Sequence, residues 1–83
     1  MSKVVMVHFK RDRTRFSGRS AEEVVRKMMH QSHDMTSDPT VYMKAVARRA
    51  FQMYQREVRT ENHIEFLRDL ERVGEGRVLK VIL

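Results

Sequence analysis

A long stretch rich in apolar residues runs from Asp38 to Arg56, and it contains no glycine and no proline after Pro39. Asp38 can accept hydrogen bonds from the free amides of a first helical turn, where Pro39 has no amide to leave unpaired. The polar residues of the stretch recur at helical spacing and form one exposed stripe: Lys44, Arg48, Gln52, Gln55 and Arg56. The stretch therefore predicts the longest helix of the chain, covered by other elements on most of its sides.

Two shorter helices are predicted on either side of this stretch. Ser20 and Glu23 have the spacing of a capping box, in which the two residues bond each other's backbone amides. Apolar residues then follow at helical spacing: Ala21, Val24, Val25, Met28 and Met29. Thr60 is placed to cap the third helix, and Gly74 is placed to end it in the left-handed conformation. The predicted buried stripe of the third helix is Phe66, Leu67, Leu70 and Val73.

Three segments are predicted to be strands. Residues 5–9 alternate between an apolar face and a mixed face, and residues 14–17 alternate again after a polar turn, which indicates a β-hairpin. Residues 78–83 are almost wholly apolar and predict a last strand, with Lys80 on its mixed face. Because so apolar a strand is poorly suited to an exposed edge, we expect it to pair beside residues 5–9, which then form the middle of the sheet.

The predicted order is strand, strand, helix, helix, helix, strand, within a single small domain that spans residues 1–83. This order is typical of an α+β two-layer sandwich, with a three-stranded sheet and all the helices on one face. Met6 and Ile82 fall on the face away from the helices. We therefore expect a homodimer that forms through the sheet edge or the sheet face.

Charge bears on the partners of the protein. The formal net charge is +6 and the pI is about 10.3, an excess that favours nucleic acid or an acidic protein surface as partner. The chain contains no cysteine, and its first apolar run is too short for a signal peptide or a membrane span. We expect a cytoplasmic protein with no membrane partner.

Three parts of the chain, residues 16–26, residues 42–50 and Arg59-Thr60-Glu61 followed by residues 66–70, together resemble a group of small bacterial proteins of unknown activity. The resemblance covers most of the chain and implies a shared fold. It implies no activity, catalytic residue or ligand.

Basic residues gather in two parts of the sequence, and both are candidates for nucleic-acid binding because phosphate contacts need exposed cationic donors. The first set lies on the predicted hairpin and just after it: Lys10, Arg11, Arg13, Arg15 and Arg19. The second set lies on the predicted long helix: Lys44, Arg48 and Arg49. A charge-rich turn is also typical of an ordinary solvated turn. Few aromatic residues are interleaved with these cations, which argues against a stacking platform for single strands.

The pattern contains no catalytic motif: there is no cysteine, no glycine-rich phosphate loop and no serine in a nucleophile elbow. His30, His33 and Asp34 have ligand-like spacing, but the two histidines straddle a predicted helix end and no fourth ligand is evident. We interpret them as solvated loop residues or as a favourable histidine at a helix C-terminus. We predict no enzymatic activity, no metal site and no cofactor.

Three classes of function remain open. The favoured one is a small basic interaction module without enzymatic activity, homodimeric, whose sheet edge or sheet face carries the binding surface. The alternative is a nucleic-acid-binding domain that uses the hairpin cations and the cations of the long helix. A small enzyme or ligand carrier is neither supported nor excluded by the sequence.

Overall fold

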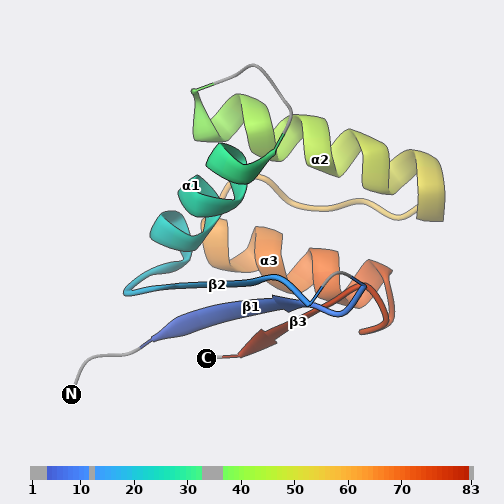
Figure 1. Ribbon diagram of the computed structural model, residues 1–83. Helices are drawn as coiled ribbons and strands as arrows, with labels where there is room; N and C mark the ends of the chain where they lie inside the picture. Colours follow the sequence, from blue (N-terminus) through green and yellow to red (C-terminus); the bar gives the residue numbers. More distant parts are fainter. Residues whose placement is uncertain (1–3, 12, 33–36, 83) are drawn as a thin grey trace.

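The computed structural model of the protein describes residues 4–11, 13–32 and 37–82. Six elements follow one another along the chain (Figure 1): β1 (Val5–Phe9), β2 (Arg15–Gly18), α1 (Ala21–Gln31), α2 (Pro39–Tyr54), α3 (His63–Val73) and β3 (Leu79–Ile82). This order confirms the predicted α+β class, and α2 is the longest helix of the described chain.

The three strands form one antiparallel sheet in the order β2-β1-β3. In the middle of the sheet, Val7 of β1 lies between Phe16 of β2 and Val81 of β3. The prediction that the first strand is central and the last strand lies beside it is therefore confirmed. Because side chains alternate along a strand, this register sorts the residues of all three strands onto an inner and an outer face.

The helices all lie on one side of the sheet, at two depths (Figure 1). α1 packs on β1 and β2, and α3 packs on β3, whereas α2 rests on α1 and α3 and contacts no strand. The expectation that α2 is covered on most sides is wrong, because a helix that rests on two others buries only the side facing them. Val41, Phe51 and Met53 are 51%, 50% and 72% exposed.

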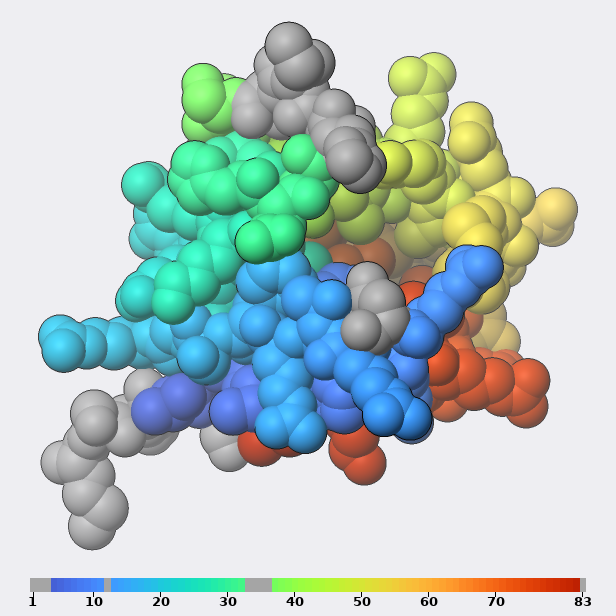
Figure 2. Space-filling view, viewed as in Figure 1, coloured from blue at the N-terminus to red at the C-terminus, as the bar shows by residue number. Residues whose placement is uncertain are grey.

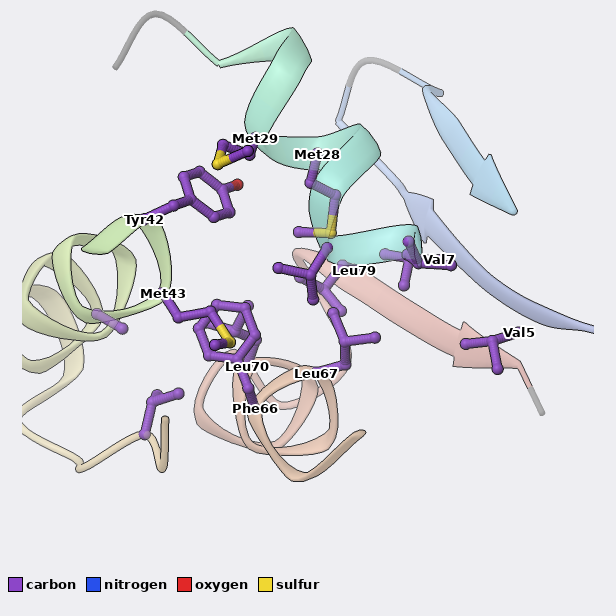
Figure 3. Packing of buried hydrophobic residues seen from close by; sticks show 14 of the residues in the cluster. Val5, Val7, Met28, Met29, Tyr42, Met43, Phe66, Leu67, Leu70 and Leu79 are labelled. Atoms are coloured by element: carbon purple, nitrogen blue, oxygen red, sulfur yellow. The ribbon is translucent and has the colours of Figure 1, made fainter. Parts of the chain in front are cut away.

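The hydrophobic core lies between the inner face of the sheet and the helices. Phe66 and Leu67 of α3, Val24 and Val25 of α1 and Val7 of β1 are almost completely buried. Figure 3 shows side chains of α2, Tyr42 and Met43 among them, that reach toward α1 and α3 and close the core from the other side. The predicted apolar face of the first strand does lie under the helices.

The helix N-termini are capped by side chains close to the predicted positions. Ser20 accepts from the Glu23 amide at 3.2 Å, but the Glu23 carboxylate accepts from the Arg19 amide at 3.1 Å and not from Ser20 as expected. The predicted cap of α3 is wrong, because Asn62 and not Thr60 caps it. The Asn62 side-chain oxygen accepts from the Ile64 amide at 2.9 Å, and the backbone of Asn62 itself is extended, as is usual for an N-cap residue.

α3 ends in a Schellman motif one residue later than predicted. Gly74 has a φ of −87°, so it is not left-handed, whereas Glu75 and Gly76 have φ values of 54° and 72°. The Gly76 amide donates to the Glu71 carbonyl at 2.9 Å, and the Glu75 amide donates to the Arg72 carbonyl at 3.0 Å. Two adjacent residues thus hold a conformation that only glycine adopts without cost.

Substitutions at these two neighbours are expected to have opposite effects on stability. Gly76→Ala should lower the free energy of unfolding by about 1 kcal/mol, because a Cβ there meets no atom within 4 Å and only the backbone conformation is penalised. Glu75→Gly should raise the free energy of unfolding by about 0.5–1 kcal/mol, because it removes the same penalty. Urea unfolding of both variants measures the difference, and effects of the same sign would contradict the left-handed assignment.

Candidate functional site

The face of the sheet that points away from the helices, the outer sheet face, is basic at one end. Its six outward positions are Met6, His8, Arg15, Ser17, Lys80 and Ile82, and they include no carboxylate. The strand register places Arg15, His8 and Lys80 next to one another in one row across the three strands. Three nitrogen-bearing side chains, two from the hairpin and one from the last strand, therefore project from one line on the surface.

A groove of about 790 Å³ continues this basic region around the free edge of β3 to α3. This β3-edge groove is lined by Lys10, Arg68, Glu71, Arg72, Glu75, Gly76, Lys80 and Val81. Within the described chain, Lys10, Arg68 and Lys80 form no ion pair, whereas Arg72 lies 3.5 Å from the Asp69 carboxylate. Three cations of the groove are therefore not neutralised by their neighbours.

Glu71 occupies part of the free edge of β3. Its carboxylate accepts a hydrogen bond from the Val81 amide at 2.5 Å, where an added strand would otherwise place a carbonyl. This cover limits strand pairing at this edge. The expected homodimer through the sheet edge or the sheet face stays a prediction.

The structure brings most of the predicted hairpin cations together at one end of the sheet. Lys10, Arg11 and Arg13 lie on the exposed turn between β1 and β2, and Arg15 follows at the start of β2. Arg19 lies beyond the other end of β2, next to the start of α1. Arg19 is therefore separated from the other four by the length of the strand.

The predicted cations of the long helix lie elsewhere. Lys44, Arg48 and Arg49 are exposed on α2, in the layer farthest from the sheet. In Figure 2 the helical segment that contains them lies on the opposite side of the molecule from β3 and the hairpin strands. The structure therefore presents two separate basic regions and not one continuous patch.

A second groove, the α2 groove, separates α2 from the return segment (residues 55–62), which runs back along the helix. The groove has a volume of about 730 Å³. Lys44, Arg48 and Phe51 line its α2 side, and the side of the return segment is lined by Glu57, Val58, Arg59 and Glu61. This surface is amphipathic and carries both signs of charge, so it differs in character from the β3-edge groove.

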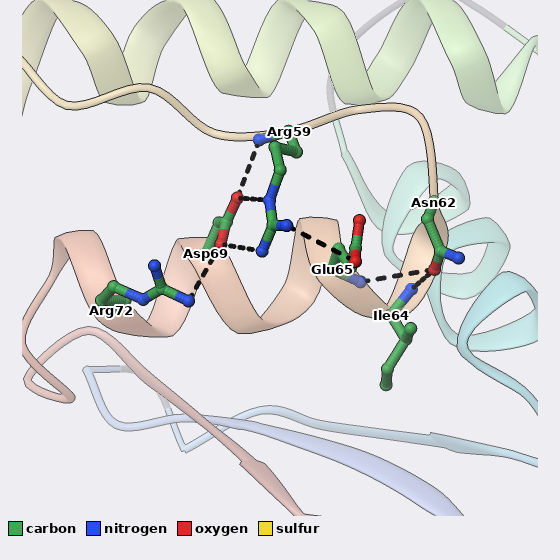
Figure 4. Close-up of polar contacts among 6 residues, drawn as sticks. All are labelled: Arg59, Asn62, Ile64, Glu65, Asp69 and Arg72. Atoms are coloured by element: carbon green, nitrogen blue, oxygen red, sulfur yellow. Dashed lines mark hydrogen bonds and ion pairs between the residues drawn. The ribbon is translucent and has the colours of Figure 1, made fainter.

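The return segment is held by Arg59 and Asp69 (Figure 4). The Asp69 side chain is 6% exposed, and its Oδ2 accepts from the Arg59 backbone amide at 3.0 Å and from Arg59 Nε at 2.9 Å. Its Oδ1 accepts from Arg59 Nη2 at 3.1 Å. Glu65 lies 3.4 Å from Nη1 of the same guanidinium. Three hydrogen bonds thus fix one point of the segment to the middle of α3.

These contacts shift the pKa values of both partners. The side-chain hydrogen bonds from Arg59 lower the pKa of Asp69 below its ordinary value, although burial opposes the shift. The hydrogen bonds to Asp69 raise the pKa of Arg59. Both groups are therefore charged at neutral pH, and the pair links the return segment to α3 as an ionic contact.

Sequence patterns did not identify Arg68 or Lys80 as partners of the hairpin cations. Arg68 lies on α3, and its position depends on how α3 packs over β3. Lys80 could have been found, because its place on the mixed face of the last strand, once paired beside the first strand, already puts it next to His8. The relation between Arg59 and Asp69, ten residues apart, has no signature in local spacing.

No metal site is evident in the described part of the chain. His33 and Asp34 lie outside the described residues, and among the others no group of three or more His, Cys, Asp or Glu side chains is placed to hold an ion. None of the helices described here combines the length and the hydropathy needed to cross a bilayer.

Comparison with protein-family models, with curated proteins and with solved structures finds no match to this chain. The resemblance to small bacterial proteins therefore stays a prediction, and function must be inferred from the chain's own surfaces.

Asp69→Asn should lower the free energy of unfolding by about 2 kcal/mol at neutral pH, because charge-assisted hydrogen bonds are lost at a buried position. A carboxylate whose pKa is lower in the folded state adds stability above its unfolded pKa, and this stability is lost as pH falls through the folded pKa. The difference between wild type and variant should therefore shrink as pH falls below about 4. Chemical unfolding at several pH values measures it.

Glu65→Gln serves as the control, because it removes an exposed carboxylate that faces the same guanidinium. Its cost should be below about 1 kcal/mol. A cost for Asp69→Asn that equals this value, or that does not change with pH, would show that Asp69 does not anchor the return segment.

Proposed function

We propose that this protein is a small binding module without enzymatic activity, which holds the phosphate backbone of a nucleic acid against the outer sheet face and the β3-edge groove. One observation carries the proposal. Cations from the turn after β1, from β2, from α3 and from β3 converge on one side of the molecule, in a row and a groove that adjoin each other. The contributing side chains are Lys10, Arg15, Arg68 and Lys80.

The electrostatics of this side support an anionic ligand. The outer sheet face has no carboxylate at its six strand positions, so an approaching phosphate meets no fixed negative charge there. Lys10, Arg68 and Lys80 are not paired with described acids, so binding a phosphate does not require an internal ion pair to break. One of the acids of the groove, Glu71, already accepts a hydrogen bond from the Val81 amide.

The side chains present favour contact with the backbone and not with the bases. The outward positions of the strands carry no aromatic ring, while Phe9 and Phe16 pack on each other with their rings 5.8 Å apart. Base stacking needs exposed rings, whereas phosphates need only exposed cations. We therefore propose sequence-independent binding whose affinity depends strongly on salt.

The proposal uses part of the predicted set of basic residues and adds to it. Lys10 and Arg15 belong to the predicted hairpin set, and Arg68 and Lys80 join them in the structure. Lys44, Arg48 and Arg49 receive no role in this surface. A cytoplasmic location, where nucleic acids are accessible, is part of the same proposal.

The test is fluorescence anisotropy of labelled random-sequence single-stranded DNA, duplex DNA and RNA with the full chain, between about 50 and 200 mM salt. We expect binding that weakens steeply with salt for at least one of these ligands. Replacing Arg15 and Lys80 together by Ala should weaken binding at low salt and lower the slope of log affinity against log salt by about one unit per cation.

The matched control replaces Arg26 and Arg56 together by Ala, which removes the same charge from positions outside the outer sheet face and the β3-edge groove. This control should keep the wild-type slope. Equal losses in both double variants would show that only net charge matters. The absence of any salt-dependent binding at low salt would overturn the proposed function.

A further inference from the structure

The α2 groove is unlike the basic side of the molecule and needs a different occupant. Phe51 is 50% exposed and lines the groove, whereas Val41 and Met53, the other exposed apolar side chains of α2, do not line it. α2 touches α1 and α3 but no strand, so its outer side is free of other elements of the described chain. A large, half-exposed aromatic side chain in a groove with charged sides fits a contact with another macromolecule.

The charges around the groove are sorted by side. Lys44 and Arg48 come from α2, and Glu57 and Glu61 come from the return segment. Arg59 also lines the return side, but its guanidinium is bonded to Asp69 and lies 3.4 Å from Glu65. Among the described residues the other four side chains form no ion pair within 4.0 Å, so the two sides do not neutralise each other across the groove. Each side is therefore free to bind a group of the opposite sign from outside the chain.

This pattern excludes an occupant with one sign of charge. A nucleic acid or an acidic peptide would meet Glu57 and Glu61, and a basic peptide would meet Lys44 and Arg48. A fitting partner carries cations and acids on opposite sides of an apolar strip. The chain's own α2 groove is a surface of that kind.

Symmetry decides how two copies would face each other. A two-fold axis that runs along the groove exchanges its two sides, so α2 of each copy lies over the return segment of the other. Lys44 and Arg48 of each copy then approach Glu57 and Glu61 of the other, and Phe51 of each copy lies over the return segment of the other. A two-fold axis across the groove would instead place cations over cations.

The groove is also held in shape before any partner arrives. Val58 is 8% exposed and belongs to the core, and Arg59 is bonded to Asp69 through its backbone amide and its guanidinium. The acidic side of the groove is thus attached to α3, and less ordering is needed on association.

From this geometry we infer that the α2 groove is the interface of a symmetric homodimer, with a second copy of this chain as its occupant. The inference does not depend on the proposed nucleic-acid function, because it uses other residues on another layer of the fold. It also places the dimer contact away from the sheet edge and the sheet face.

Charge reversal on the two sides of the groove tests the inference. One variant carries Lys44→Glu with Arg48→Glu, and the other carries Glu57→Lys with Glu61→Lys. Each variant alone would place like charges opposite each other, so its self-association should weaken by about tenfold or more relative to wild type. The two variants mixed in equal amounts should associate with each other, because every opposed pair is again of opposite sign. Sedimentation velocity from micromolar to hundreds of micromolar protein measures all four samples.

Circular dichroism of each variant confirms that it is folded before the mixture is examined. Ile82→Glu is the control for contact through the sheet, since Ile82 is 48% exposed on the outer sheet face. This control should leave the dimer unchanged. A wild-type mass of one chain at the highest concentration, a mixture that stays monomeric while wild type dimerises, or loss of the dimer in Ile82→Glu would each overturn the inference.

Discussion

The contact between Arg59 and Asp69 is the constraint on which the outer half of this fold depends. Asp69 is the one buried charged side chain among the described residues, and it accepts from both the backbone and the guanidinium of Arg59. An unpaired carboxylate at that position would be costly, so the return segment has one favourable position along α3. Because that segment links α2 to α3, the contact adds a second constraint to the direct packing of α2 on α1 and α3.

The helices form two layers, α1 with α3 on the sheet and α2 above them, and these layers separate two surfaces with different charge patterns. The outer sheet face and the β3-edge groove carry cations without adjacent acids on the strands, whereas the α2 groove has cations and acids on opposite sides. In the proposed dimer, contact through α2 leaves both outer sheet faces directed away from the interface. A long nucleic acid could then bind the basic surfaces of both copies in one dimer. Its affinity would be higher than for a single copy, although each copy uses the same residues.

Most of the fold could be predicted from short-range patterns, and the errors have a common cause. The capping residue Ser20, the alternation in residues 5–9 and the apolar last strand are local features, and they give the right elements in the right order. The cap of α3 could not be predicted from the local sequence, because the side chains of both Thr60 and Asn62 can accept a hydrogen bond from a free helix amide. Arg59 is bonded to Asp69 of α3 three residues before the cap, so the position of the chain that enters the helix involves a contact that spans ten residues.

The candidate surfaces were harder to predict than the elements, because each combines side chains from distant segments. The basic hairpin was visible in the sequence, but Arg68 joins it only through the packing of α3 over β3.

The apolar content of α2 was interpreted as a sign of burial, and this interpretation failed for a geometric reason. A chain of 83 residues has too few other elements to surround a helix of 16 residues that already rests on two others. Tyr42, Met43 and Ala50 are buried in the core, whereas Phe51 and Met53 stay exposed. The half-exposed Phe51 gains from being covered by another surface. A second copy in the α2 groove would supply that surface, so Phe51 and the charges beside it point to the same interface, whereas Met53 does not line the groove.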